Sequence, residues 1–382
     1  MIKTKELYYE DQYMKSFTAT VLECTEKGAD YIIVLDQTAF FPEQGGQSSD
    51  TGLIAGIPVS KVTISDGIIY HYCNDAVPEG FLVECTVDFD RRFSFMQCHS
   101  GEHMFSGTVH NLLGGENVGF HLSDNTATMD FNIKLTKEEL RKVETIVNQK
   151  IWENAPIIYR YPTLEEAKEL DFRCKIDLME GIRIVVIPGV DACACCAPHV
   201  AHTGEIGLFK VTGTESKKDG IRVHFAAGQR ALEYINSLCD CATDTASYLS
   251  VSSLNLLETV KGMKEDSQNL KFKLSGLSEA LLIKDAEALF SSEPNICLFA
   301  DDIDMNTARR IVNKLMPTRE GYVGVFIPSS NRHNFIIGSN TKDCTKLCSL
   351  LSEKYDLKAG GSASMIQGST AESKETILHF LP

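Results

Sequence analysis

The sequence contains no apolar run that approaches the length of about 18 residues needed to cross a membrane. Its start, MIKTKELYYEDQY, lacks the apolar core of a secretory signal, so we predict a cytoplasmic protein with no membrane partner. Thirteen cysteines, an odd number, then indicate reduced thiols rather than a disulfide framework. Some of these thiols are free to bind metal.

The sequence is also poor in basic residues. It has 37 Lys and Arg residues against 52 Asp and Glu residues, which gives a formal net charge of −15. This balance argues against a general nucleic-acid coat, because phosphate binding needs concentrated Lys and Arg. It leaves room for one locally basic face. Basic and acidic residues are equal in number in 291–382, so this segment repels a polyanion least.

The chain is too long for one ordinary core, and its pattern changes three times. Residues 1–90 read as five short strands, which predicts a small β-barrel or sandwich. Residues 91–228 mix helical periods with strands and predict an α+β domain. Residues 229–290 contain no proline and are expected to be helical. Residues 291–382 read as a small α/β domain, with TILHFL as a strand and KAGGSASMIQGST as a loop.

Two helices are expected in the second of these regions. The first follows Arg91 and stops at Gly114 and Gly115. The second begins at Thr136, a plausible N-cap with Glu139 three residues on, which is the spacing of a capping box.

A heptad pattern follows in 249–281. Steps of three and four place apolar residues at eight of ten positions, with Ser252 and Ser267 as the exceptions. The pattern favours a coiled-coil hairpin or a homodimer seam through 249–281. A helix packed on its own domain is the alternative.

Two pairs of metal-ligand residues have a four-residue spacing. His99 and His103, in CHSGEHMF, leave the same face of a helix. Cys195 and His199 repeat the spacing in DACACCAPHVAHTGEIG. Three imidazoles and one thiolate suit Zn²⁺, so the two pairs together predict a zinc site.

The sequence leaves the details of this site open. Cys193 or Cys196 is an alternative to Cys195, and His202 is an alternative to His199. Four protein ligands usually form a closed structural site, whereas a catalytic zinc keeps one position open. The order His99-Ser-Gly-Glu102-His103 also fits the H-x-x-E-H motif of inverted zincins, which makes a metallopeptidase a competing hypothesis.

The chain resembles the alanyl-tRNA editing proteins, the AlaX family, which are related to the editing domain of alanyl-tRNA synthetase. The resemblance rests on HSGEH, on CCAPH followed by VAHTGEIG, and on the early loop LDQTAFFPEQGGQSSDTG. The segment GFHLSDNTATMDF matches the family's pocket segment, and 229–382 resembles the long form with a coiled coil and a DHHA1 domain. CCAPH stands where many members have CGGTH, and the DHHA1 glycine run is reduced to AGGSASMIQGS.

The resemblance implies a hydrolase for mischarged tRNA(Ala), chiefly seryl-tRNA(Ala), with glycyl-tRNA as a further candidate. Nothing in the chain resembles a synthetase activation domain, and no ATP-binding motif is evident, so editing would occur in trans. The DHHA1-like domain would bind the tRNA body. A non-catalytic, dimeric tRNA-binding protein with structural zinc is the third hypothesis.

Six residues are expected to serve this chemistry beside the zinc. Thr38 would recognise the serine hydroxyl, because a buried hydrogen-bond partner discriminates against alanine. Gly45 and Gly46 would let backbone N–H groups approach the substrate. Glu102 is the candidate general base. Gln47 would bind the ester or the terminal ribose, and His121 would be a polar residue of the pocket.

Overall fold

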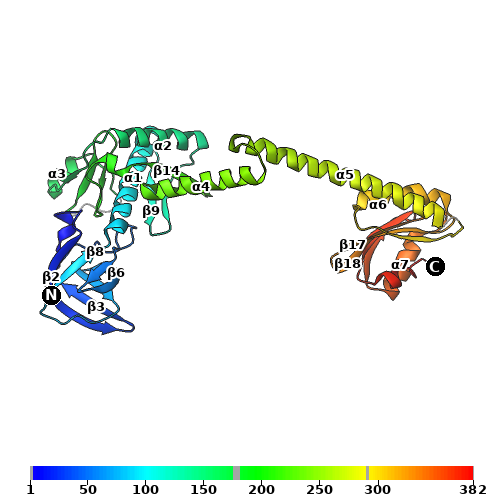
Figure 1. Ribbon diagram of the computed structural model, residues 1–382, viewed down its shortest axis with the longest axis horizontal. Coiled ribbons are helices and arrows are strands. Elements are labelled where there is room, and N and C mark those ends of the chain that lie inside the picture. The colour runs from blue at the N-terminus through cyan, green and yellow to red at the C-terminus, as the bar shows by residue number, and fades with distance from the viewer. Residues whose placement is uncertain (1–2, 175–180, 290–291, 382) are drawn as a thin grey trace. The chain divides into compact units, whose positions relative to one another are not determined.

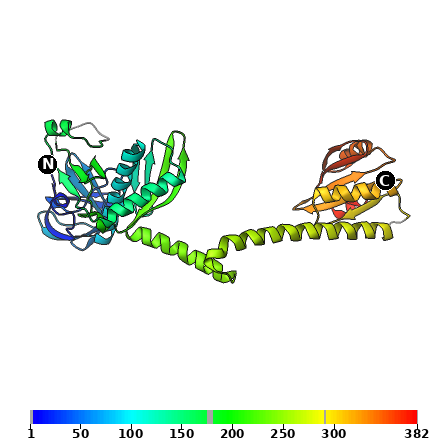
Figure 2. The ribbon, with the colours of Figure 1, turned by 90° about the horizontal axis from the view of Figure 1, so that it is seen from above.

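A computed structural model describes residues 3–174, 181–289 and 292–381. The chain divides into two compact units, residues 1–242 and 243–382, shown in Figure 1 and, from above, in Figure 2. Both units mix helices and strands, which confirms the predicted α+β class. Among the described residues, no helix combines the length and the apolar character needed to span a membrane.

The first unit begins with a six-stranded closed barrel. Around the barrel the strands follow the order β2-β3-β7-β6-β5-β8. Their bounds are Ser16–Lys27 (β2), Asp30–Leu35 (β3), Gly52–Ile54 (β5), Ile57–Ser65 (β6), Ile68–Cys73 (β7) and Leu82–Val87 (β8). Alternation fixes which side chains point inward: Val83, Cys85 and Val87 of β8 are buried and the residues between them are exposed. The 3₁₀ turn η1 (Leu7–Tyr9) follows β1 (Lys5–Glu6), which pairs with β4 (Gln37–Thr38).

Helix α1 (Phe89–Leu113) is the central element of this unit. Asp88 caps its N-terminus, and Gly114, at φ 67°, ends it as expected. Every residue from Phe95 to Val109 is buried, although several of them are polar. Buried polar groups need partners, so α1 is the helix on which a built site is expected.

Two sheets and two further helices surround α1. The strands of the larger sheet follow the order β14-β15-β10-β9 and those of the smaller one β11-β12-β13. The capping box predicted at Thr136 and Glu139 is confirmed in α2. The bounds are Asn117–Leu122 (β9), Ala127–Phe131 (β10), Lys137–Trp152 (α2), Ile158–Arg160 (β11), Leu164–Glu169 (α3), Ile184–Ile187 (β12), Asp191–Ala194 (β13), Thr203–Ile206 (η2), Phe209–Lys217 (β14) and Gly220–Ala227 (β15).

The helical region 229–290 is interrupted. Helix α4 (Gln229–Tyr248) ends before Leu249, and α5 (Leu256–Leu289) begins only after a break that contains Ser250 at φ 54° and the turn η3 (Ser253–Asn255). The prediction of a seam from residue 249 is therefore wrong for its first two positions. From Leu256 onward the pattern lies on one continuous helix, visible in both views (Figure 1 and Figure 2).

The second unit is built on a five-stranded sheet in the order β16-β17-β18-β20-β19. Its apolar core lies on both faces, with α5 and α6 on one and α7 and α8 on the other. The bounds are Ile296–Phe299 (β16), Met305–Leu315 (α6), Met316–Thr318 (η4), Val323–Ser329 (β17), Arg332–Gly338 (β18), Cys344–Lys354 (α7), Leu357–Gly361 (β19), Met365–Thr370 (β20) and Lys374–Ile377 (α8).

Two local predictions for this unit are wrong. TILHFL is not a strand, because Ser373 caps the short helix α8 and its hydroxyl accepts from the backbone N–H of Thr376. KAGGSASMIQGST is not a loop but the paired strands β19 and β20. Gly368 lies against the backbone of Lys358, where a side chain would not fit. The glycine therefore allows β20 to pair closely with β19.

Candidate metal centre and adjoining cavity

The four predicted ligands meet in the first unit. His99 and His103 come from α1, Cys195 follows β13 directly, and His199 lies in the loop after it. Their ligand atoms all lie within 4.8 Å of one another. Cys195 Sγ is 3.5 Å from His99 Nε2 and 3.4 Å from His199 Nε2.

Each imidazole is oriented by a second group behind it. His99 Nδ1 lies 2.7 Å from Gln47 Oε1, and His103 Nδ1 lies 3.0 Å from Asp191 Oδ2. His199 Nδ1 lies 3.0 Å from Ser100 Oγ. With Nδ1 engaged on all three rings, the Nε2 atoms are the ones left for a common ion. Ligands held in this way are typical of protein metal sites.

The donor set fits zinc. Bond lengths of about 2.3 Å to sulfur and about 2.05 Å to nitrogen, at tetrahedral angles, separate neighbouring ligand atoms by about 3.5 Å. The two sulfur–nitrogen distances above agree with this value. No carboxylate belongs to the four-residue group, so the softer, borderline metals are favoured over Mg²⁺ or Ca²⁺.

Charge within the cluster also favours metal binding. Burial raises the pKa of Cys195, but His99 and His199 outweigh it and bring that pKa well below its ordinary value. Burial lowers the pKa of His199 to about 3. Burial also opposes charge on His103, but Asp191 and the Cys195 sulfur raise its pKa well above its usual range. The Cys195 thiolate and the neutral His199 are in the protonation state that binds a metal, whereas His103 would release its proton when a metal binds.

The structure places the neighbouring candidates differently. Asp191, Cys193 and Cys195 fall on one side of β13 and its extension, and of the three cysteines Cys195 is the one whose sulfur groups with the three imidazoles. Cys193 instead groups with His103 and Asp191, and Cys196 lies opposite Gly45. His202 is half exposed beside Glu205, outside the cluster.

A cavity of about 640 Å³ opens beside the ligands. Its wall includes His99, Glu102 and His103 of α1, Phe120 of β9, and Gly45 of the early loop. Two arginines, Arg173 and Arg183, also line it.

Glu102 is a buried member of this wall rather than a solvated neighbour. One carboxylate oxygen accepts from Ser106 Oγ at 2.6 Å and from Asn117 Nδ2. The other oxygen lies 3.9 Å from His103 Nε2. Glu102 is therefore held with one oxygen beside the ligand group.

Asp191 and Arg173 were not predicted as site residues from the sequence. Arg173 donates two hydrogen bonds of 2.8 Å to Asp191, which in turn holds His103. The available signal was the alternating DACAC, which puts Asp191 on the same face as the ligand Cys195.

The early loop docks onto β9 beside the cavity. The backbone of Leu122 donates to Gly46 O at 2.8 Å and accepts from Ser48 N at 2.9 Å. Gly46 has φ +82°, and a side chain there would overlap the carbonyl oxygen of Phe120. Gly45 lines the cavity, whereas Gly46 is the residue at which the loop contacts β9.

Gln47 has a different place from the one expected. It is 1% exposed, does not line the cavity, and holds His99 through its Oε1 atom. Its Nε2 atom has no partner among the described residues. The structure therefore places Gln47 behind a metal ligand rather than against the ester or the ribose.

Thr38 and His121 are not brought into the cavity either. Thr38 is fully buried, and its Oγ1 lies 2.9 Å from His71 Nε2. His121 is exposed, because alternation along β9 turns the preceding Phe120 toward His99, with ring centroids 4.7 Å apart. The expectation that His121 is a pocket residue is corrected: Phe120 occupies that position.

The pair of Thr38 and His71 predicts an acid-sensitive barrel. His71 Nδ1 donates to Ile33 O at 3.0 Å, so its Nε2 is the acceptor for the Thr38 hydroxyl. Burial lowers the pKa of His71 to about 4 from 6.5. Between these pH values the unfolded chain binds a proton that the folded chain does not. The free energy of unfolding is then fully present above pH 6.5 and falls as pH drops toward about 4.

Urea unfolding at a series of pH values checks this expectation. The variant His71→Gln keeps an acceptor for Thr38 but does not titrate, so its stability should fall less steeply between pH 6.5 and 4. Equal slopes for the variant and the parent protein would contradict the assignment.

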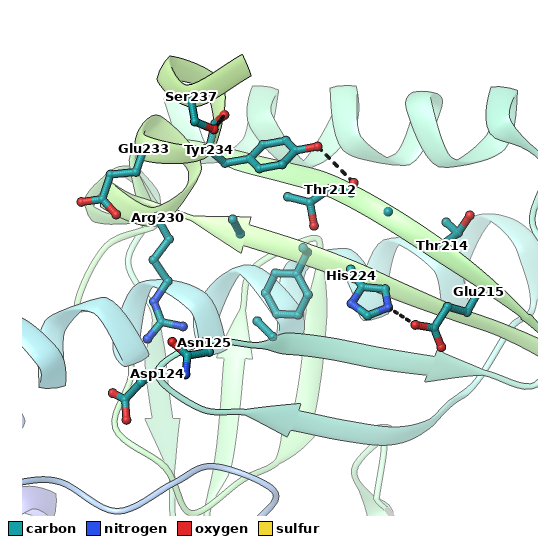
Figure 3. Close-up of a pocket in the computed structure, with 14 residues that line it drawn as sticks. Asp124, Asn125, Thr212, Thr214, Glu215, His224, Arg230, Glu233, Tyr234 and Ser237 are labelled. Atoms are coloured by element: carbon teal, nitrogen blue, oxygen red, sulfur yellow. Dashed lines mark hydrogen bonds and ion pairs between the residues drawn. The ribbon is translucent and has the colours of Figure 1, made fainter. Parts of the chain in front are cut away.

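A second cavity of about 710 Å³ lies in the same unit, between α4 and the strands β14 and β15 (Figure 3). Hydrogen bonds join some of the polar groups in its wall. Tyr234 Oη donates to Thr212 O at 3.1 Å, and His224 Nε2 lies 2.8 Å from Glu215 Oε1. None of the individual site residues named from the sequence lines it, although Asp124, Asn125 and Ala127 belong to the segment GFHLSDNTATMDF.

Two family models match parts of the first unit. One, described as "Threonyl and Alanyl tRNA synthetase second additional domain", matches residues 182–222, which contain Cys195 and His199. Another, described as "tRNA synthetases class II (A)", matches residues 2–91. The barrel region thus does resemble part of a class II synthetase, contrary to the expectation from the missing ATP-binding motifs.

Curated relatives of the chain include alanine–tRNA ligases. That of Methanopyrus kandleri is 29% identical and aligns with 96% of this chain and 42% of its own length. That of Thermofilum pendens is 34% identical over 73% of this chain and 32% of its own length. That of Thermococcus kodakarensis is 30% identical over 95% of this chain and 40% of its own length.

A crystal structure of the C-Ala domain from Aquifex aeolicus alanyl-tRNA synthetase is similar over 23% of this chain and 89% of its own, with 14% identity and a TM-score of 0.20. That score is too low for a structural conclusion. The sequence matches are the informative ones. The chain is thus a relative of the alanine–tRNA ligases and spans less than half of their length.

Proposed function

We propose that the chain is a trans-editing hydrolase that deacylates mischarged tRNA(Ala), chiefly seryl-tRNA(Ala). The observation that carries the proposal is the buried group of three histidines and one cysteine on the wall of an open cavity. The ligand pair Cys195 and His199 lies inside the segment that matches a domain of threonyl and alanyl tRNA synthetases.

The residues of the chain suit ester hydrolysis. Zinc, when bound by the four ligands, would supply positive charge that polarises the ester carbonyl. Glu102 has a carboxylate oxygen free on the cavity side and accepts the proton of the attacking water. The water oxygen forms a bond to the ester carbon, the bond to the ribose oxygen breaks, and the proton passes to that ribose oxygen. Gly45 lets the backbone approach the reacting group closely.

The site gives less support to a peptidase. In the inverted-zincin scheme the glutamate of H-x-x-E-H serves a metal whose third ligand is a carboxylate. Here the group is completed by Cys195 and His199, so the metal surroundings differ.

Serine release from seryl-tRNA(Ala) tests the proposal. The zinc-loaded chain should release serine and leave alanyl-tRNA(Ala) intact. Glu102→Gln keeps the hydrogen-bonding shape of the side chain and should lower the rate about 100-fold or more at unchanged zinc content. Absence of serine release at full zinc content would favour a tRNA-binding protein with structural zinc. Cleavage of peptides instead would favour the peptidase.

We also infer a homodimer through α5. Its heptad side chains are exposed in the single chain, with Met263, Leu270 and Leu277 at 52%, 65% and 71%. A second copy would bury this seam. Leu270→Asp should convert a dimer to a monomer in analytical ultracentrifugation. Phe272→Asp, at an 80% exposed position off the seam, should leave the dimer intact. A monomeric parent protein at micromolar concentration would contradict the inference.

A further inference from the structure

Arg183 is a buried cation on the wall of the metal-site cavity. It directly precedes β12 and is 8% exposed. Its guanidinium carbon lies 4.2 Å from the ring centroid of Tyr159 and 5.2 Å from that of Tyr9. The two rings hold the guanidinium in place beside the ligand loop.

The hydrogen bonds of Arg183 leave part of the guanidinium unused. Its Nη1 atom donates to Cys195 O at 3.0 Å and to Ala197 O at 2.9 Å. Its Nε atom is buried and has no partner among the described residues. Its Nη2 atom likewise makes no hydrogen bond within residues 3–174, 181–289 and 292–381.

The charge of Arg183 also lacks a carboxylate partner in the part of the chain that the structure describes. No carboxylate of the described residues lies within 4.0 Å of it, whereas Arg173, on the same cavity, has the Asp191 carboxylate. The remaining acids of the cavity wall are held elsewhere: Glu6 accepts from Tyr8, and Glu102 from Ser106 and Asn117. Carbonyl groups and aromatic faces stabilise a cation but do not neutralise it. A buried charge without a counter-ion is costly, which favours an anion supplied by a ligand.

We propose that Arg183 binds the phosphodiester group that joins the terminal adenosine of the tRNA to the preceding nucleotide. A guanidinium with unused N–H donors matches phosphate oxygens in charge and geometry. Placed on the wall of the metal-site cavity, this contact anchors the terminal nucleotide while the aminoacyl ester faces the metal ligands. This assignment of the phosphate rests on the proposed function, but the anion site itself does not.

Binding of adenosine 5′-monophosphate and of adenosine to the zinc-loaded full chain tests the proposal. Adenosine 5′-monophosphate carries the phosphate in question, and the ratio of the two dissociation constants isolates its contribution. The parent protein should bind the monophosphate about tenfold or more tightly than adenosine. Arg183→Gln should abolish this preference and leave the affinity for adenosine unchanged.

Arg160→Gln is the matched control. Arg160 is an exposed residue of the neighbouring strand β11, opposite Ile184, and does not line the cavity. Its loss changes the net charge equally but should preserve the preference.

Three other binding results overturn the phosphate site or its assignment to Arg183. A parent protein without preference for the monophosphate has no phosphate site, and a preference that survives in Arg183→Gln assigns the site elsewhere. Equal weakening of both ligands in Arg183→Gln means that Arg183 only holds the ligand loop through Cys195 and Ala197. A lost preference in a chain that never releases serine would instead keep the anion site and reject the deacylase.

Discussion

Replacing His103 by alanine is expected to remove the metal and to lower seryl-tRNA(Ala) deacylation by at least about 100-fold. His103 supplies one of the four ligand atoms, and its ring is fixed by Asp191, which Arg173 holds in turn. Without the imidazole, the buried Asp191 and its partner Arg173 remain next to the space that the ring had filled. Metal analysis of the purified protein and the rate of serine release measure the two effects.

The control for this variant lies on the same helix. His110, in the last turn of α1, is half-buried and pairs with Glu116 outside the cluster. His110→Ala should therefore retain both zinc and activity. Full zinc content and unchanged activity in His103→Ala would contradict the four-ligand site.

The second large effect is expected at Arg92, which joins α1 to the early loop. Arg92 and Asp50 form an ion pair with both side chains fully buried. Arg92 also donates to Ala39 O at 2.5 Å, and Asp50 accepts from Phe41 N at 2.6 Å. Arg92→Met leaves a buried carboxylate without its partner, which should lower the free energy of unfolding by about 3–5 kcal/mol.

Hydrogen exchange of the α1 amides in increasing urea measures this loss in the full chain. The double variant Arg92→Met/Asp50→Asn removes both charges and should recover part of the stability. Arg222→Met is the matched surface control, because Arg222 pairs with Asp130 but is 36% exposed, so its loss should cost about 1 kcal/mol or less. If Arg92→Met lowers the free energy of unfolding no more than Arg222→Met does, the predicted role of the buried ion pair is wrong.

The approach of His99 to His103 was predictable because their spacing is a property of local structure. Four residues along a helix bring His99 and His103 to one face, and that geometry does not depend on the rest of the fold. The capping box at Thr136 and Glu139 was predictable for the same reason. Short-range rules hold wherever the helix forms.

The roles of the surrounding residues depend on contacts across the fold. Gln47 and His99 are 52 residues apart, and only the docking of the early loop onto β9 and α1 brings them together. Thr38 was assigned from the same loop, yet its hydroxyl turns into the barrel toward His71. The prediction of His121 was wrong by one position, because neighbouring residues of a strand point to opposite faces and Phe120 is the one that faces the site.

The candidate zinc ligands also have a consequence for how the chain holds together. Two of them lie on α1 and two beyond β13, nearly a hundred residues later. An ion bound at this point closes a long loop of the unfolded chain, as a disulfide does in an exported protein. It is thus a removable cross-link. Chelation should loosen α1 from the strand behind it, so the metal content of a preparation reports on its folding as well as on its chemistry.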